Sequence, residues 1–169
     1  MVGAKKGMKR TRKTWNPFKG CSYVNSGCDD CASLELAAKY CEGDAPFKGL
    51  VEIGPDGAAW TGDVRYDPKK LHDPFSWSNC TVQVQQLGDL FHPAIEEEHL
   101  DLVFGVMADT LTNKYYINTM RPGRWIDYIL EGSSRQGFRT ERSPANVTVT
   151  VYPCYSEALT SRQLTRASQ

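Results

Sequence analysis

Three cysteines stand close together near the start of the chain, at positions 21, 28 and 31, in the pattern C-x6-C-x2-C. Thiolates are the ligands that zinc and iron–sulfur clusters commonly take in proteins. Three thiolates from one loop can hold a metal ion or a cluster and leave one coordination position open for chemistry. We therefore predict that Cys21, Cys28 and Cys31 are metal ligands.

The chain has six cysteines, and an even number in a short chain would also suit a disulfide framework. The basic N-terminus is followed by no apolar segment of signal-peptide length, and no segment approaches the length of a membrane span. We therefore expect a cytoplasmic protein with reduced thiols and no membrane contact. The patterns around Cys41 and Cys80 predict small core residues. Cys154 follows a strand, so a fourth ligand or a redox-active thiol is an alternative to a packing role there.

Zinc is the alternative to iron at the cysteine loop. A structural zinc site normally has four ligands, and no fourth Cys or His lies at a zinc-finger spacing from Cys31. His72, His92 or Cys154 could still approach the loop in the folded chain. A third interpretation is that the three cysteines are buried thiols in a turn-rich loop and bind no metal.

Charge is distributed unevenly along the 169 residues, although the net charge is zero. Seven Lys and Arg residues precede the first acidic residue, Asp29. We predict that residues 1–13 form a basic flexible arm and that residues 14–169 form a single domain. The arm could contact the phosphates of a nucleotide or nucleic acid. A solvated tail without a ligand is the alternative.

Apolar residues alternate between helical and strand spacing along the chain. The strands that we expect cover residues 64–66, 81–85, 114–118 and 146–152, and the helices cover residues 32–41, a segment after Pro93 that includes Ile95 to Met107, and residues 123–130 and 156–166. Helices that alternate with strands favour a parallel α/β layer over a helix bundle or a β-sandwich.

Polar residues follow two of these strands. Asp89 comes shortly after the strand of residues 81–85, and Asn118, Thr119 and Arg121 end the next one. The ends of parallel strands are where α/β proteins build their sites, so these side chains suit a ribose, a carboxylate or a phosphate. A turn aspartate and a solvated surface loop are the alternatives.

Several short motifs, taken together and in order, resemble one family. They are Thr14-Trp15-Asn16-Pro17, Gly20-Cys21, Ser26-Gly27-Cys28-x-x-Cys31, Trp60-Thr61-Gly62, Gly88-Asp89-Leu90-Phe91-His92 and Phe104-Gly105-Val106-Met107-Ala108. This set resembles the bacteriophage three-cysteine-motif family, whose members are similar to radical S-adenosylmethionine (SAM) proteins. The resemblance extends from about Thr14 to Val151.

The resemblance implies a fold, a cofactor and an activity. The fold would be a shortened, partial (β/α) barrel of about four strand–helix units. Cys21, Cys28 and Cys31 would bind three irons of a [4Fe–4S] cluster, and SAM would chelate the fourth iron and give a 5′-deoxyadenosyl radical on reduction. Asp89 stands where radical SAM proteins place a turn that holds the SAM amino group. The protein would then be a phage-encoded enzyme of the host cytoplasm, acting on a nucleotide or nucleic acid.

The chain also departs from the family pattern. Ala32 replaces an aromatic residue after the third cysteine, and Met120 replaces a lysine. The chain stops soon after the strand around Val147 to Val151, so an incomplete barrel would leave an edge for a protein partner or a homodimer to cover. The missing units and the lost lysine favour the alternative function, which is a noncatalytic relative that keeps an iron–sulfur or zinc site as a structural element and binds a partner. The intact three-cysteine loop favours the enzyme.

Overall fold

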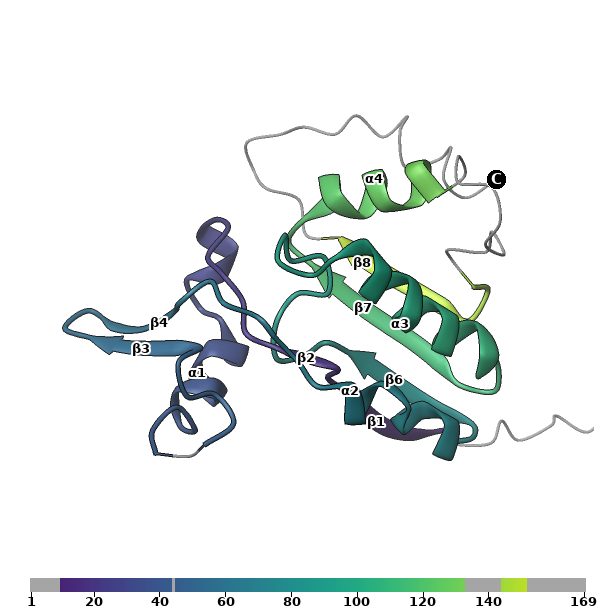
Figure 1. Ribbon diagram of the computed structural model, residues 1–169, viewed down its shortest axis with the longest axis horizontal. Coiled ribbons are helices and arrows are strands. Elements are labelled where there is room, and N and C mark those ends of the chain that lie inside the picture. Colours follow the sequence, from purple (N-terminus) through teal and green to yellow (C-terminus); the bar gives the residue numbers. More distant parts are fainter. Residues whose placement is uncertain (1–9, 44, 133–143, 152–169) are drawn as a thin grey trace, which may run out of the picture.

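A computed structural model describes residues 10–43, 45–132 and 144–151 of the chain. Its centre is a four-stranded sheet in which every pair of neighbouring strands is parallel (Figure 1). The strands, in sheet order, are β1 (Thr11–Trp15), β6 (Cys80–Val84), β7 (Lys114–Thr119) and β8 (Val147–Val151). The parallel α/β layer predicted from the sequence is confirmed for these strands.

Helices link the parallel strands, because a parallel pair cannot be joined by a tight turn. The short helix α2 (Pro68–Leu71) and the 3₁₀ helix η2 (Asp73–Ser76) precede β6. Helix α3 (Glu97–Asp109) joins β6 to β7, and α4 (Pro122–Gly132) follows β7. Strands therefore enter the sheet in chain order, each beside the one before it.

A long insertion between β1 and β6 carries the cysteines and extends to one side of the sheet (Figure 1). It contains β2 (Phe18–Lys19) paired with β5 (Arg65–Tyr66), the 3₁₀ helix η1 (Ser26–Cys28), α1 (Ala32–Ala38), and a hairpin of β3 (Val51–Gly54) and β4 (Gly57–Trp60). A second, smaller apolar cluster around Ala37, Phe47 and Leu50 holds α1 against the hairpin.

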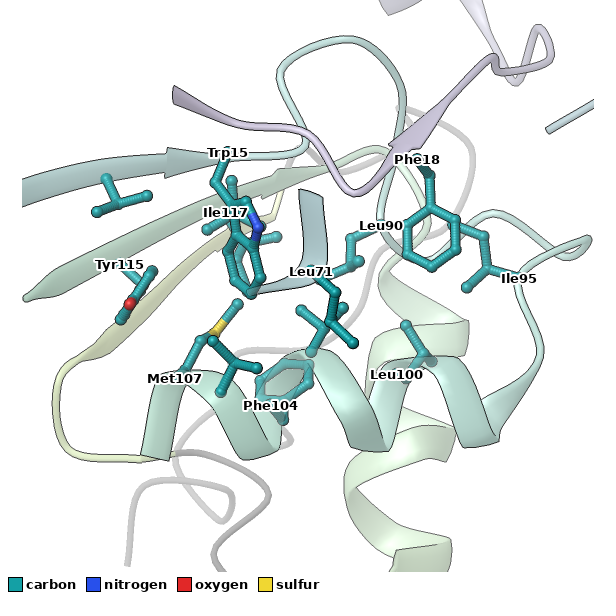
Figure 2. Packing of buried hydrophobic residues seen from close by; sticks show 14 of the residues in the cluster. Trp15, Phe18, Leu71, Leu90, Ile95, Leu100, Phe104, Met107, Tyr115 and Ile117 are labelled. Carbon is teal, nitrogen blue, oxygen red and sulfur yellow. The ribbon is translucent and has the colours of Figure 1, made fainter. Parts of the chain in front are cut away.

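The main core lies between the sheet and α3 (Figure 2). Alternate residues of β6 and β7 point to this side, among them Val82, Tyr115 and Ile117, and each is fully buried. The buried apolar side of α3, the helix predicted after Pro93, meets them, with Leu100 and Phe104 at its centre. Burying a side chain of this size stabilises the fold by roughly 1.5–3 kcal/mol, so this packing fixes where the strand ends lie.

The other face of the sheet is polar. The alternation of β7 gives Lys114, Tyr116 and Asn118 to this face, and all three are exposed. On β6 the same face carries Thr81 and Gln83, which are partly exposed. The sheet is therefore amphipathic, because one face packs in the core and the other face is polar and exposed.

Some boundaries differ from those expected. Strand β1 begins at Thr11, inside the segment 1–13 that we expected to be an arm. The first helix ends at Ala38 instead of residue 41, because a turn and the break at Gly43 follow directly. Its N-cap is Cys31. The expected helix 156–166 lies outside the described residues. Among the helices that the structure describes, none is long and apolar enough to cross a membrane.

Candidate cysteine site

All three predicted metal ligands line one cavity at the carboxyl ends of β6 and β7. The cavity has a volume of about 150 Å³. Its lining combines the cysteine loop, the hairpin and both strand ends: Cys21, Ser22, Gly27, Cys28, Cys31, Ser33, Trp60, Gly88, Asp89, Asn118, Thr119, Met120 and Arg121. The four polar residues predicted from the strand ends are therefore beside the cysteines, although up to 100 residues separate them in the chain.

Two glycines allow the cysteine loop to approach the end of β6. Gly20 and Gly88 form a parallel bridge, and the Gly20 N–H donates to the carbonyl of Leu87 at 3.3 Å. Gly20 has φ +104°, and a Cβ there would collide with the carbonyl oxygen of Asp63. A Cβ on Gly88 would collide with the carbonyl oxygen of Gly20. Only glycine fits at these two places, so Cys21 is held directly above the strand.

Side-chain amides complete the attachment of the loop. The Gln85 amide pairs with the backbone of Phe18, accepting from its N–H at 3.2 Å and donating to its carbonyl at 2.9 Å. Gln85 is buried and has φ 52°, a left-handed conformation that costs energy for a non-glycine residue. Asn16 accepts from the N–H of Leu87 at 3.1 Å. These bonds satisfy backbone groups that the sheet leaves unpaired.

The second and third cysteines lie in a capped turn. The Asn25 side chain accepts from the N–H of Gly27 at 2.8 Å and starts η1, which ends at Cys28. Cys31 is the N-cap of α1. The hydroxyl of Ser33 donates to the carbonyl of Gln86, just past the end of β6. The turn is therefore tied to the same strand end as Cys21.

Asp89 is the centre of a buried polar network. Its side chain is 4% exposed. The two carboxylate oxygens accept from the N–H groups of Phe91 and Met120, each at 2.9 Å. They also accept from the Thr119 hydroxyl at 2.8 and 3.0 Å and from the Arg121 guanidinium at 3.0 Å. A carboxylate offers about four lone-pair sites, so protein donors fill them. The network ties the loop after β6 to the end of β7.

Arg121 extends this network to the cysteines. Its Nη1 donates to Asp89 and lies 3.8 Å from the Sγ of Cys21, while Nη2 donates to the carbonyl and the hydroxyl of Ser22 at 3.0 and 2.9 Å. Burial raises the pKa of the Cys21 thiol, and the positive charge of Arg121 partly opposes this effect. One guanidinium thus fixes the cysteine loop against both strand ends.

His92 forms a hydrogen bond with the Ser22 hydroxyl, which also accepts from Arg121. Its Nδ1 accepts from the N–H of Ala94 at 3.2 Å, which leaves the ring proton on Nε2, 2.8 Å from the Ser22 hydroxyl. Burial, together with the charges of Arg121 and Arg124, lowers the pKa of His92 to about 4. The ring is therefore neutral near pH 7 and acts as a fixed hydrogen-bond partner.

The four residues predicted to bind a cofactor differ in whether their side chains are already hydrogen-bonded within the protein. Asp89, Thr119 and Arg121 bond mainly to one another and to the cysteine loop. The exposed side chain of Asn118 makes no hydrogen bond to another described residue. Their role toward a cofactor stays a prediction. Met120, in place of the expected lysine, packs its methyl group over Gly27.

Among the described residues, no three Cys, His, Asp or Glu side chains converge closely enough to hold a metal ion. Of the alternative zinc ligands, His72 lies beside the ring of Phe75 and is not part of the cavity, and His92 contacts Ser22. Cys154 lies outside the described residues. The five described cysteines are free thiols. Cys80 is buried in the main core, and Cys41 packs against the smaller cluster, as predicted.

A family model described as "Protein of unknown function (DUF5131)" matches residues 5–165. The chain belongs to this family. No curated protein and no solved structure matches the chain significantly. The residues matched by the DUF5131 model include every residue that lines the cysteine cavity.

Sequence reasoning did not identify Ser22 and His92 as parts of this site. Ser22 is next to Cys21, but a serine in a loop gives no signal of its own. His92 was named only as an alternative zinc ligand and as the last residue of a family motif, without a role toward Ser22. Gly20 and Gly88 did stand beside Cys21 and Asp89 in the sequence motifs, and that adjacency is the signal that predicts a close backbone approach.

Proposed function

We propose that this DUF5131 chain is a radical SAM-like iron–sulfur protein in which Cys21, Cys28 and Cys31 hold a [4Fe–4S] cluster. The observation that carries the proposal is that three thiols from one loop line a single cavity together with polar groups from two strand ends. Cysteine thiolate is the usual ligand of such clusters. The type of donor therefore matches the group, and the three thiols would have to move closer together than they lie in the described structure to share one cluster.

The chain's own residues prepare this site. The pKa of Cys21 is raised by burial, so its thiol must lose a proton when a metal binds. The Arg121 guanidinium, 3.8 Å from its sulfur, places a positive charge where the thiolate forms. Trp60 and Met120 add apolar walls that limit the access of water. Such contacts around the ligands tune a metal centre.

When bound, the cluster and SAM would supply a 5′-deoxyadenosyl radical that abstracts hydrogen from a substrate. Asn118 is the residue best suited to contact SAM or the substrate, because its amide is exposed at the cavity. Asp89 would need to exchange one of its present donors to hold the SAM amino group. Its main role in our proposal is to position Arg121, which in turn positions the cysteine loop.

The proposed fold type is a partial (β/α) barrel of the radical SAM kind. Four parallel strands that enter the sheet in chain order support it, since closed barrels of this kind are built in the same order. Within the described residues β1 and β8 each pair on one side only. A protein partner or a second copy of the chain would cover such an edge. The phage origin and the host cytoplasm belong to the same proposal.

The test is anaerobic reconstitution with iron and sulfide, followed by EPR of the reduced protein with and without SAM. The expected result is a [4Fe–4S] signal that changes when SAM is added. Cys28→Ala should abolish the cluster, whereas the buried Cys80→Ala should leave the iron content unchanged, which makes it the matched control. Stoichiometric zinc in place of iron, or equal loss of iron in both variants, would contradict the proposal.

A noncatalytic relative that keeps the metal loop as a staple is the second candidate. The observation that favours it is the Asp89 network, in which the carboxylate oxygens and the Arg121 guanidinium are already bonded within the protein. A metal bound at the three cysteines would then hold the insertion to the sheet and present a surface to a partner. A cluster whose EPR signal is unchanged by SAM is the outcome that selects this candidate.

A further inference from the structure

The polar face of the sheet forms a groove next to the cysteine cavity. Because register partners in a parallel sheet point to the same side, Arg12 and Thr81 lie side by side, as do Thr14, Gln83 and Tyr116. The groove has a volume of about 740 Å³. It is lined by Arg12, Lys13, Thr14, Thr81, Gln83, Gln86 and Tyr116. A volume of this size is in the range of small-ligand sites.

The charge of this face favours an anionic ligand. The four strands of the parallel sheet carry Arg12, Lys13 and Lys114 and no acidic residue, although the whole chain has as many acids as bases. The guanidinium of Arg12 belongs to the groove face, whereas the Lys13 ammonium lies 5.7 Å from the ring centre of Trp77, which packs against the core. Arg12 is therefore the cation of the groove best suited to a phosphate.

The groove also contains an aromatic side chain and hydrogen-bonding groups. Tyr116 is 36% exposed in the middle of the sheet, beside the amide of Gln83. Flat, partly exposed rings of this kind stack on nucleobases, and the stacking accepts any base. The combination of a guanidinium, a tyrosine ring and amides at one face matches the parts of a nucleotide: phosphate, base and sugar hydroxyls.

The groove leads to the cysteine cavity. Asn118 lines the cavity and lies two residues beyond Tyr116 on the same face of β7, which is a separation of about 7 Å along a strand. Gln86 lines the groove, and its carbonyl accepts from Ser33, which lines the cavity. A ligand stacked on Tyr116 would therefore reach the thiol end of the sheet.

We propose that this groove binds one nucleotide unit of a single-stranded nucleic acid, with the base on Tyr116 and a phosphate on Arg12. A strand is favoured over a free nucleotide because exposed Lys114 is in register with Thr81, which pairs with Arg12 on the same face, and adds a second positive charge for a neighbouring phosphate. This inference rests on the proposed function, for which it names the class of substrate.

The test is fluorescence anisotropy of the reconstituted 169-residue chain with labelled 12-nucleotide single-stranded DNA and RNA over a series of salt concentrations. The expected dissociation constant is about 1–100 µM at physiological salt. Arg12→Ala should lower the slope of log affinity against log salt by about 1. Tyr116→Leu should weaken binding on the order of tenfold, and Tyr116→Phe should stay within about twofold because the ring remains.

Matched controls locate the site. Lys69→Ala removes the same unit charge from α2, on the core side of the sheet, and Tyr40→Leu removes an exposed ring from the cysteine insertion. Both should bind like the wild type. No oligonucleotide binding, equal losses in the Arg12 and Lys69 variants, or competition by a free mononucleotide as strong as by the strand would each overturn the proposal.

The iron content and EPR spectrum of each variant are measured in parallel, and these separate the two proposals. Strand binding that persists in Cys28→Ala, which lacks the cluster, would keep the groove assignment when the cluster assignment fails. A normal cluster together with no binding of the oligonucleotide would contradict the groove proposal and leave the cluster proposal standing. Circular dichroism of the Arg12 and Tyr116 variants checks that these exposed substitutions leave the fold intact.

Discussion

Around α3 the molecule is packed from apolar side chains, whereas around Cys21 it is held by hydrogen bonds between buried polar groups. Phe104 on α3 contacts the rings of Phe91, Trp125 and Tyr128. Arg121 instead donates to Asp89 and to Ser22. Apolar packing is non-directional and adds up over many contacts, while each polar group in the second region depends on one particular partner.

The difference shows that one set of residues stabilises the fold and another set determines the position of the cysteine loop. The core fixes the sheet, and it tolerates small changes in shape. The polar network then fixes the cysteine loop to the carboxyl edge of that sheet, where a shift of a few tenths of an ångström breaks a hydrogen bond. Substitutions in the core should therefore destabilise the whole fold, whereas substitutions in the polar network should displace the cysteine loop locally.

The largest effect should come from the core. Phe104→Ala should lower the free energy of unfolding by about 4 kcal/mol, because the side chain is 3% exposed and leaves a cavity among other rings. Urea unfolding measures the change. Leu102→Ala on the same helix is the control, since Leu102 is 50% exposed and should cost less than about 1 kcal/mol. Equal effects of the two substitutions would mean that α3 does not pack as described.

Next in size is the removal of the central cation of the network. Arg121→Ala should cost about 3 kcal/mol, because Asp89 keeps its N–H donors but loses the charge that pairs with its own. Hydrogen exchange should show faster exchange in the cysteine loop than in β7. Arg121→Lys should recover only part of the loss, since an ammonium cannot make the same forked contacts. Uniform acceleration in both regions would contradict a local role.

Acid should weaken the cysteine end through His92. Its pKa is about 4 in the folded chain against 6.5 for the ordinary residue, so between these values the unfolded chain binds more protons. The stability that neutral His92 contributes is complete above pH 6.5 and decreases as the pH falls toward 4, by about 2 to 3 kcal/mol in total.

Urea unfolding at a series of pH values measures this slope. The matched variant is His92→Gln, which keeps a hydrogen-bonding side chain but does not titrate in this range. Its stability should be lower at pH 7 and should fall less between pH 6.5 and 4. The same pH slope in the variant and in the wild type would show that other groups control the acid response.

The smallest effect on stability should come from Asn118. Asn118→Ala should change the free energy of unfolding by less than about 0.5 kcal/mol, because the side chain is exposed. The iron content should not change either, whereas the change that SAM causes in the EPR signal should decrease. Loss of iron in this variant would mean that Asn118 supports the cysteine loop itself and not a ligand beside it.

Local patterns were sufficient for much of the fold. The alternation of valine with polar residues predicted β6 and β8 to within one residue or two, and the apolar stripe predicted the core face of α3. Strand β1 was missed because Thr11 to Thr14 are polar and exposed, so that Trp15 is the only buried residue of the strand. The hairpin of β3 and β4 was not among the expected strands, since its strands are short and mostly exposed.

The same division holds for the site. The sequence by itself determined which residue types are available: three closely spaced cysteines, and polar residues directly after two parallel strands. Only the tertiary structure decided that Arg121, 100 residues from Cys21, lies against its sulfur, and that Asp89, Thr119 and Arg121 bond to one another. Spacing along the chain reports local geometry, whereas partners in a buried network are chosen by how the strands pack, and that information is spread over the whole core.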